Sequence, residues 1–230
     1  MRLEQILFTQ GFGTRHECRG LIALSRVSFA GRVMTDPDAE IDPEGITFAV
    51  DGKSWPYVEK ALIVMNKPAG YECSQKPTHH PSVMTLLPAP LRVRGVQPVG
   101  RLDADTTGLL LFTDDGALQH RLTHPKRHVP KRYRVHCKHP VSDETVKKLV
   151  DGVLLVDEKT PLRAADVSLL APEVFEMTIT SGKYHQVKRM VAAAGNRVES
   201  LERVAFGKLR LADDLKPGHR RWLAGASEVI

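Results

Sequence analysis

Hydrophobic positions in the first part of the chain predict two short helices. Leu3, Ile6 and Leu7 fall on one face of a helix over residues 2–10. The letters "GFG" then break the pattern, and a second helix follows. Thr14 has the position of its N-cap and Glu17 lies three residues on, the spacing of a capping box.

After the helices the pattern changes to that of strands. Residues 27–33, "VSFAGRV", predict a hairpin with its turn at Ala30-Gly31, and residues 46–52 predict a third strand. We expect apolar packing of the second helix through Leu21, Ile22 and Leu24. Residues 51–60, with Gly and Pro, are typical of a linker. We therefore expect a small domain over 1–57 and a larger one over 58–230.

In the larger domain, strand patterns alternate irregularly with helix patterns. The strands are expected at 61–66, 96–99, 108–113, 131–138, 153–156, 162–170, 173–180 and 201–207. Helices are expected near 82–87, 115–123, 143–151 and 185–195, the last with Gly195 at its C-terminal cap. This order predicts an α+β fold, a mixed sheet with helices packed against it.

Composition narrows the class of protein. No run of eighteen apolar residues is present, so no membrane span is expected. The N-terminus lacks the apolar core of a signal peptide. The three cysteines, Cys18, Cys73 and Cys137, form no CxxC pair, which argues against a disulfide framework or zinc cluster and favours the cytoplasm.

Charge is unevenly distributed along a chain whose net charge is +6. Residues 36–51 hold six acids and no Lys or Arg. Residues 120–139 hold seven Lys or Arg, five His and no acid. Because like charges repel at close spacing, such a basic segment indicates an anionic partner such as a phosphate backbone.

Three polar stretches are candidates for one chemical site: "GRLDADTTG" (100–108), "KRYRV" (131–135) and "SGKYHQVKRM" (181–190). An enzyme that acts on a nucleic-acid base needs an aromatic face to receive the base, for which Tyr133 is suited. Arg101 could fill the gap that the base leaves. Asp103 could act as nucleophile or base, and Lys188 or Arg189 could keep it charged.

Other interpretations of these residues are open. Asp103 and Asp105 could form a D-x-D magnesium pair, but a nearby Lys188 would oppose a metal. His120, His124 and His128 have helical spacing, but Pro125 interrupts the helix and argues against zinc. We expect Asp105 to cap the turn beside Thr106 and Thr107. The non-enzymatic alternative is an RNA-binding ribosome-assembly protein, which would have no use for Asp103 opposite Lys188.

Residues 1–57 resemble the small RNA-binding module shared by a ribosomal small-subunit protein, tyrosyl-tRNA synthetases and many RNA-modifying enzymes. The resemblance is carried by "RLEQIL", "TRHECRGLI" and "RVSFAGRV". It implies that this module binds RNA through its arginines, which are Arg15, Arg19, Arg26 and Arg32.

Nearly the whole chain resembles the pseudouridine synthases of the RsuA type. The motifs are "GRLDADTTGLLLFTDDG", "KRYRV", "SGKYHQVKRM" and "VESLERVAFGKL". The resemblance implies the pseudouridine synthase fold, with a largely antiparallel sheet, and isomerisation of uridine to pseudouridine without a cofactor or metal. It also implies roles for individual residues: Asp103 as the catalytic aspartate, Tyr133 stacked on the base, Lys188 paired with the aspartate, and Leu201 lining the pocket.

The stretches "NKPAGYECS" and "HHPSVMTLL" are most similar to the member of that family that modifies 16S ribosomal RNA at the uridine-516 site. We therefore expect a cytoplasmic monomer that acts on a small-subunit assembly intermediate; a family member acting on large-subunit RNA is the alternative. Further RNA contacts are expected from Arg101, Lys131, Arg132, Lys183 and Arg189.

Overall fold

The computed structural model describes all 230 residues and divides them into two compact units. The N-terminal unit comprises Met1–Ala61 and Met84–Gln97, and the sheet unit comprises Leu62–Val83 and Pro98–Ile230. The division after Ala61 lies four residues beyond the expected boundary at 57. The inclusion of 84–97 in the N-terminal unit was not expected.

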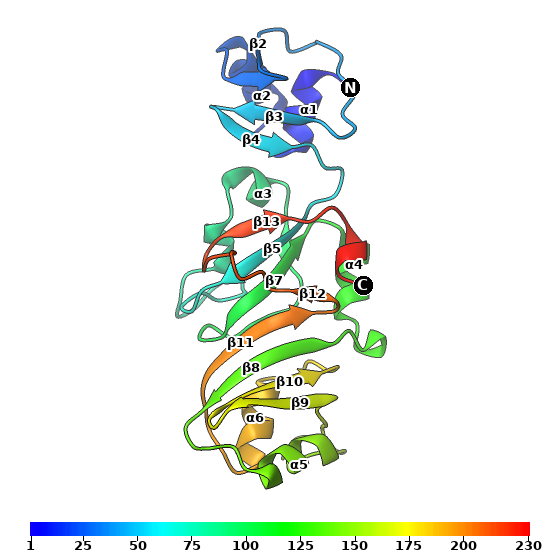
Figure 1. The fold of residues 1–230 in the computed structure, drawn as a ribbon. Helices are drawn as coiled ribbons and strands as arrows, with labels where there is room; N and C mark the ends of the chain where they lie inside the picture. Colours follow the sequence, from blue (N-terminus) through cyan, green and yellow to red (C-terminus); the bar gives the residue numbers. More distant parts are fainter. The chain divides into compact units, whose positions relative to one another are not determined.

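Two helices and a four-stranded antiparallel sheet form the Met1–Ala61 part of the N-terminal unit (Figure 1). The helices are α1 (Leu3–Thr9) and α2 (Arg15–Ala23); the strand order is β2 (Arg32–Met34), β1 (Val27–Phe29), β3 (Thr47–Val50) and β4 (Lys53–Pro56). The capping box is confirmed: the Thr14 side chain accepts the Glu17 N–H, and the Glu17 carboxylate accepts the Thr14 N–H at 2.7 Å. Strand β4 corrects the expected linker over 51–60, because Trp55 is buried and pairs with Phe48.

The core of this unit uses the apolar face that the sequence indicated. Leu3, Ile6 and Leu7 are buried, and Ile22 of α2 is fully buried. Leu24, expected in the core, is exposed because it follows the last turn of α2 as its C-cap.

Helix α3 (Ala89–Val93) belongs to the N-terminal unit and was missed. After it, the Arg94 guanidinium donates to the Gln10 side-chain oxygen at 2.7 Å and to the carbonyls of Val58 and Glu59. These bonds join residues far apart in sequence, so local patterns could not indicate them.

The sheet unit has a nine-stranded mixed sheet, which confirms the expected α+β class (Figure 1). The strand order is β13 (Arg220–Trp222), β5 (Leu62–Lys67), β7 (Thr107–Thr113), β11 (Val198–Phe206), β8 (Lys131–Cys137), β10 (Val174–Ile179) and β9 (Asp166–Ala171). The short strands β12 (Leu209–Arg210) and β6 (Gln97–Pro98) pair with β11 and β7. Strands β7 and β11 pair in parallel, and the other pairs among β5, β7, β8, β9, β10, β11, β12 and β13 are antiparallel.

Most expected elements of this unit are present, and the differences concern short elements. Its α-helices are α4 (Gly116–Thr123), α5 (Asp143–Asp151) and α6 (Gln186–Ala193), and its short 3-10 helices are η2 (Pro125–Arg127) and η3 (Ala226–Glu228); η1 (Val83–Leu86) lies at the unit boundary. The strand expected at 153–156 is only an isolated bridge from Val153 to Leu162. Strands β12 and β13 were missed because they are too short for a two-residue period. Gly195, with φ 95°, follows the cap residue Ala194 of α6.

Gly108 sets the spacing between the parallel strands β7 and β11. It pairs with Arg203, its φ is +100°, and a Cβ there would lie 2.4 Å from the Arg203 carbonyl oxygen. A side chain at this position would force the two strands apart, since glycine alone tolerates both the φ and the close approach. This close approach brings β11 beside the loop that precedes β7.

Candidate active site

A cavity of about 440 Å³ lies within the sheet unit and contains most of the expected site residues. Its walls come from the loop before β7, from β8, from the loop before α6 and from β11. The expected residues that line it are Arg101, Asp103, Lys131, Tyr133, Lys183, Lys188 and Leu201. Segments separated by about a hundred residues in sequence therefore meet at one pocket.

A buried lysine holds the loop that carries Asp103. Lys67, at the end of β5, is 0% exposed, and its ammonium donates to the carbonyls of Pro68, Asp103, Ala104 and Thr106 at 2.8–3.3 Å. Burial lowers the pKa of Lys67. This residue was missed; the signal was a lysine that directly ends an apolar strand, since a buried cation requires several acceptors.

Both oxygens of the Asp103 carboxylate have cationic or hydrogen-bonding partners. One oxygen lies 3.2 Å from Lys188 Nζ and the other 3.2 Å from His185 Nε2. The Asp103 side chain is about one-third exposed at the pocket. The carboxylate is thus fixed in direction and still accessible to a ligand.

Asp105 does not have the expected role of a turn cap. Its carboxylate accepts two hydrogen bonds from Lys188 Nζ, at 2.7 and 2.9 Å. Partial burial disfavours the charged form of both groups. The carboxylates of Asp105 and Asp103 outweigh this effect on Lys188 and raise its pKa. Lys188 outweighs it on Asp105 and lowers the pKa of that acid. Lys188 is therefore a cation shared by two acids, which the sequence did not indicate.

His185 lies in one of the motifs, but the sequence suggested no role for it. It is the N-cap residue of α6 and has a left-handed backbone, φ 46° and ψ 34°, which is uncommon outside glycine and occurs at functional sites. The Tyr184 ring stacks on its imidazole at a centroid distance of 3.8 Å. This conformation places both His185 and Lys188 against Asp103.

Tyr133 and Leu201 form apolar walls of the pocket. Tyr133, on β8, is 8% exposed, and Leu201, on β11, is 7% exposed. Lys131, two residues before Tyr133 on β8, lines the same pocket, as strand alternation requires. Arg203 pairs with Tyr133 across the strands and also lines the pocket; it was missed as a site residue.

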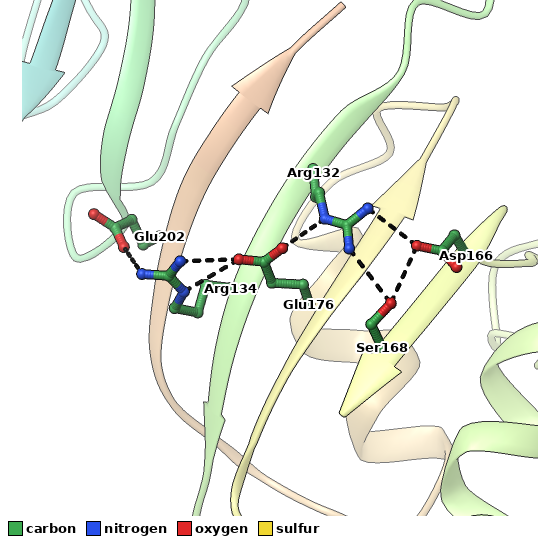
Figure 2. Close-up of polar contacts among 6 residues, drawn as sticks. All are labelled: Arg132, Arg134, Asp166, Ser168, Glu176 and Glu202. Atoms are coloured by element: carbon green, nitrogen blue, oxygen red, sulfur yellow. Dashed lines mark hydrogen bonds and ion pairs between the residues drawn. The ribbon is translucent and has the colours of Figure 1, made fainter. Parts of the chain in front are cut away.

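The alternate residues of β8 are engaged elsewhere in a network of charges (Figure 2). Arg132 and Arg134 both donate to Glu176 of β10, at 2.6 and 2.9 Å. Arg132 also reaches Asp166, and Arg134 reaches Glu202. Arg132 does not line the pocket, because adjacent strand residues point to opposite faces.

Several expected RNA-binding residues have acidic partners within the chain. Lys183 lies 3.2 Å from Glu158, and Arg189 pairs with Asp157. In the N-terminal unit Arg15 pairs with Glu4, Arg19 with Asp38 and Arg26 with Asp51, while Arg32 is exposed. The acidic loop, residues 36–51, thus supplies the partners of Arg19 and Arg26, while the partner of Arg15 lies in α1.

Neither a metal site nor a membrane span is evident in the structure. No group of three or more His, Cys, Asp and Glu side chains is arranged to hold a metal ion. None of the helices has the length and apolar character that crossing a bilayer requires.

Comparisons with known proteins define the class to which this fold and site belong. The structure matches a solved pseudouridylate synthase with a TM-score of 0.70 and 33% identity, over 99% of this chain and 98% of that one. The family model for RNA pseudouridylate synthase matches residues 61–193. The chain belongs to the RNA pseudouridylate synthase family, and it is an isomerase.

Two curated relatives extend the similarity over nearly the full chain. Ribosomal small subunit pseudouridine synthase A of Yersinia pestis is 39% identical over 96% of this chain and 94% of its own length. The uncharacterized RNA pseudouridine synthase YtzG of Bacillus subtilis (strain 168) is 38% identical, over 97% of this chain and 95% of its own.

Proposed function

We propose that the protein converts one uridine of small-subunit 16S ribosomal RNA, at a uridine-516 type site, to pseudouridine, and that Asp103 is the catalytic residue. The observation that carries the proposal is the Asp103 carboxylate, held at the pocket by Lys188 and His185. The name of the Yersinia pestis relative supports the choice of RNA.

The reaction fits the composition of the pocket. The N1–C1′ bond of uridine breaks, the uracil ring turns, and C5 bonds to C1′. No atom is gained or lost overall, so the reaction consumes no second substrate. Asp103 acts on the ribose or on the ring, as nucleophile or base, and the ion pair with Lys188 holds its carboxylate in place.

Tyr133 supplies the stacking surface for the base, and Leu201 closes the apolar side. Arg101 is exposed at the pocket and is placed to enter the RNA where the base has left. Lys183 contacts phosphates near the target nucleotide. In the N-terminal unit, Arg15, Arg19, Arg26 and Arg32 hold a more distant RNA element.

The test is a map of pseudouridines in ribosomal RNA from a strain that lacks this protein. The strain is complemented with the wild type, with Asp103→Asn or with an empty vector. We expect one position of 16S RNA to lose its pseudouridine without the protein and to regain it only with the wild type. Loss at a large-subunit position would replace the proposed target, and full restoration by Asp103→Asn would refute the catalytic role.

A further inference from the structure

Two basic side chains in the pocket, Lys131 and Arg203, have no carboxylate partner. Arg203 is 2% exposed; its Nε donates to the Leu109 carbonyl at 2.8 Å, and its Nη2 is buried without any hydrogen-bond partner. Lys131 Nζ donates only to the Val129 carbonyl, at 2.9 Å. A buried cation is costly unless it is paired, so this arrangement indicates a ligand that supplies the missing acceptors.

The two cations lie beside one another and beside the aromatic surface for the base. Arg203 is the cross-strand partner of Tyr133, and Lys131 is that of Phe206. The Phe206 ring has Arg203 at 5.2 Å and Lys131 at 5.6 Å from its centroid. A planar ligand stacked on Tyr133 would therefore have its edge near these two groups.

No acidic side chain of the pocket is free to neutralise Lys131 and Arg203. Asp103 is the one carboxylate among the lining residues, and its oxygens are bound to His185 and Lys188. Burial and the field of Arg203 lower the pKa of Lys131 to about 8. Lys131 is thus still mainly charged at neutral pH and is poorly solvated, which favours binding to an acceptor on a ligand.

We propose that Lys131 and Arg203 form the subsite for the ring-carbonyl oxygens of the target pyrimidine. The inference rests on the proposed function and assigns a role within it. When N1–C1′ breaks, its electron pair passes to the ring and is shared by N1 and the two carbonyl oxygens. Cations at those oxygens stabilise this charge. The pair returns as C5 bonds to C1′, after which C5 loses its proton and N1 takes one up.

A phosphate of the target nucleotide is the competing source of the anionic oxygens, and the experiment separates the two. Single-turnover rates and affinities are measured with the full chain on a ribosomal RNA fragment built around the mapped pseudouridine position. The fragment is made with uridine or with an abasic ribose at that position, so that the second version keeps every phosphate and lacks the base. An error in the proposed target would change the fragment but not the comparison of variants.

The variants are Lys131→Met, which has similar length and no charge, Lys131→Arg, and the control Lys147→Met on the exposed side of α5. We expect Lys131→Met to lower the single-turnover rate on uridine RNA about tenfold or more, the loss typical of one hydrogen bond to a charged group. Its affinity for the abasic RNA should equal that of the wild type. Lys131→Arg should recover part of the rate, and Lys147→Met should change neither quantity.

Equal losses of affinity by Lys131→Met on the two RNAs would show a phosphate contact and overturn the proposal. An unchanged single-turnover rate on uridine RNA would overturn it as well. Circular dichroism and Tm are recorded for each variant. Because Lys131 is half-buried and only its ammonium is removed, we expect Lys131→Met to fold like the wild type.

Discussion

At the residue scale, the carboxylates of Asp103 and Asp105 compete for one cation, the ammonium of Lys188. Lys188 Nζ is closer to Asp105, at 2.7 Å, than to Asp103, at 3.2 Å. Asp105 is also the more exposed acid, at 74% of its side chain against 32% for Asp103. Asp105 therefore weakens the hold of Lys188 on Asp103 and limits where the ammonium can move.

Asp105→Asn should leave Lys188 to pair with Asp103 alone. We expect a several-fold lower single-turnover rate, because a tighter ion pair makes the Asp103 carboxylate a weaker nucleophile or base, and little change in affinity for RNA. Asp103→Asn should abolish turnover while leaving affinity similar. The measurement is single-turnover pseudouridine formation with RNA titrations in parallel; equal rates for Asp105→Asn and Asp103→Asn would contradict this division of roles.

Tyr133 tests whether a ring face or a hydroxyl acts in the pocket. Tyr133→Phe keeps the ring, so we expect nearly unchanged binding of the target RNA. Tyr133→Leu should weaken binding by about 1–3 kcal/mol, the range for stacking of one base on an aromatic side chain. Affinities are measured with Tm as a control for folding, since Tyr133 is buried. Similar losses of affinity from both substitutions would assign the effect to the hydroxyl.

At the element scale, strands β9, β10, β8 and β11 are joined by charges as well as by their backbones (Figure 2). The strand register aligns Ser168, Glu176, Arg134 and Glu202 in one row across the sheet. Tyr133 and Lys131 belong to β8, as Arg132 and Arg134 do, but they face the pocket. The network thus fixes the strand whose other face forms the site.

Glu176→Gln should destabilise the sheet unit by roughly 1–3 kcal/mol, as expected for loss of hydrogen bonds to charged groups. Burial opposes the charge of Glu176, but Arg132 and Arg134 outweigh it and lower its pKa. The folded state therefore binds the proton less tightly than the unfolded state. The stabilisation is complete above the usual glutamate pKa of about 4.3 and is lost as pH falls through the lower, folded value.

Urea unfolding at several pH values measures this effect. The difference in the free energy of unfolding between wild type and Glu176→Gln should shrink below about pH 4.3. Glu144→Gln is the matched control, because Glu144 forms an exposed i,i+4 pair with Lys148 and should contribute little. A difference that stays constant down to low pH would contradict the assignment to the ionised carboxylate.

At the scale of the whole molecule, the N-terminal unit carries both the expected RNA-binding arginines and their acidic partners. The Arg19–Asp38 and Arg26–Asp51 pairs are exposed to solvent. Exposed pairs contribute little to stability, so RNA phosphates can replace the carboxylates at small cost. The unit therefore has cations that are available to RNA despite the acidic loop.

A variant of the full chain with four arginines replaced by serine should bind ribosomal RNA more weakly. The four positions are Arg15, Arg19, Arg26 and Arg32. For every phosphate of single-stranded RNA that is no longer neutralised by an arginine, the log–log salt slope should become shallower by about 0.7. Removing the acids instead, with Asp38→Asn and Asp51→Asn, should tighten binding. Affinity is measured over a series of salt concentrations, and an unchanged slope in the arginine variant would show that this unit does not hold RNA.

The amino-acid sequence alone was sufficient for the features that depend on near neighbours and on residue type. The capping box at Thr14, the amphipathic face of α1 and the apolar strands β5 and β7 follow from local spacing. The motifs around Asp103, Tyr133 and Lys188 led to the family through a resemblance, and that family is confirmed. These properties require only a few consecutive residues to be recognised.

The three-dimensional fold was needed to establish which charges meet. Lys67 ends an apolar strand, Arg203 lies within β11, and their acceptors include carbonyls 39 and 94 residues away. Asp105 is 83 residues from the lysine that it binds, and Glu176 is more than 40 residues from the arginines of β8 that donate to it. Such contacts arise when the sheet brings distant segments of the chain together. Electrostatic partners are set by distance in space, and local sequence patterns do not encode that distance.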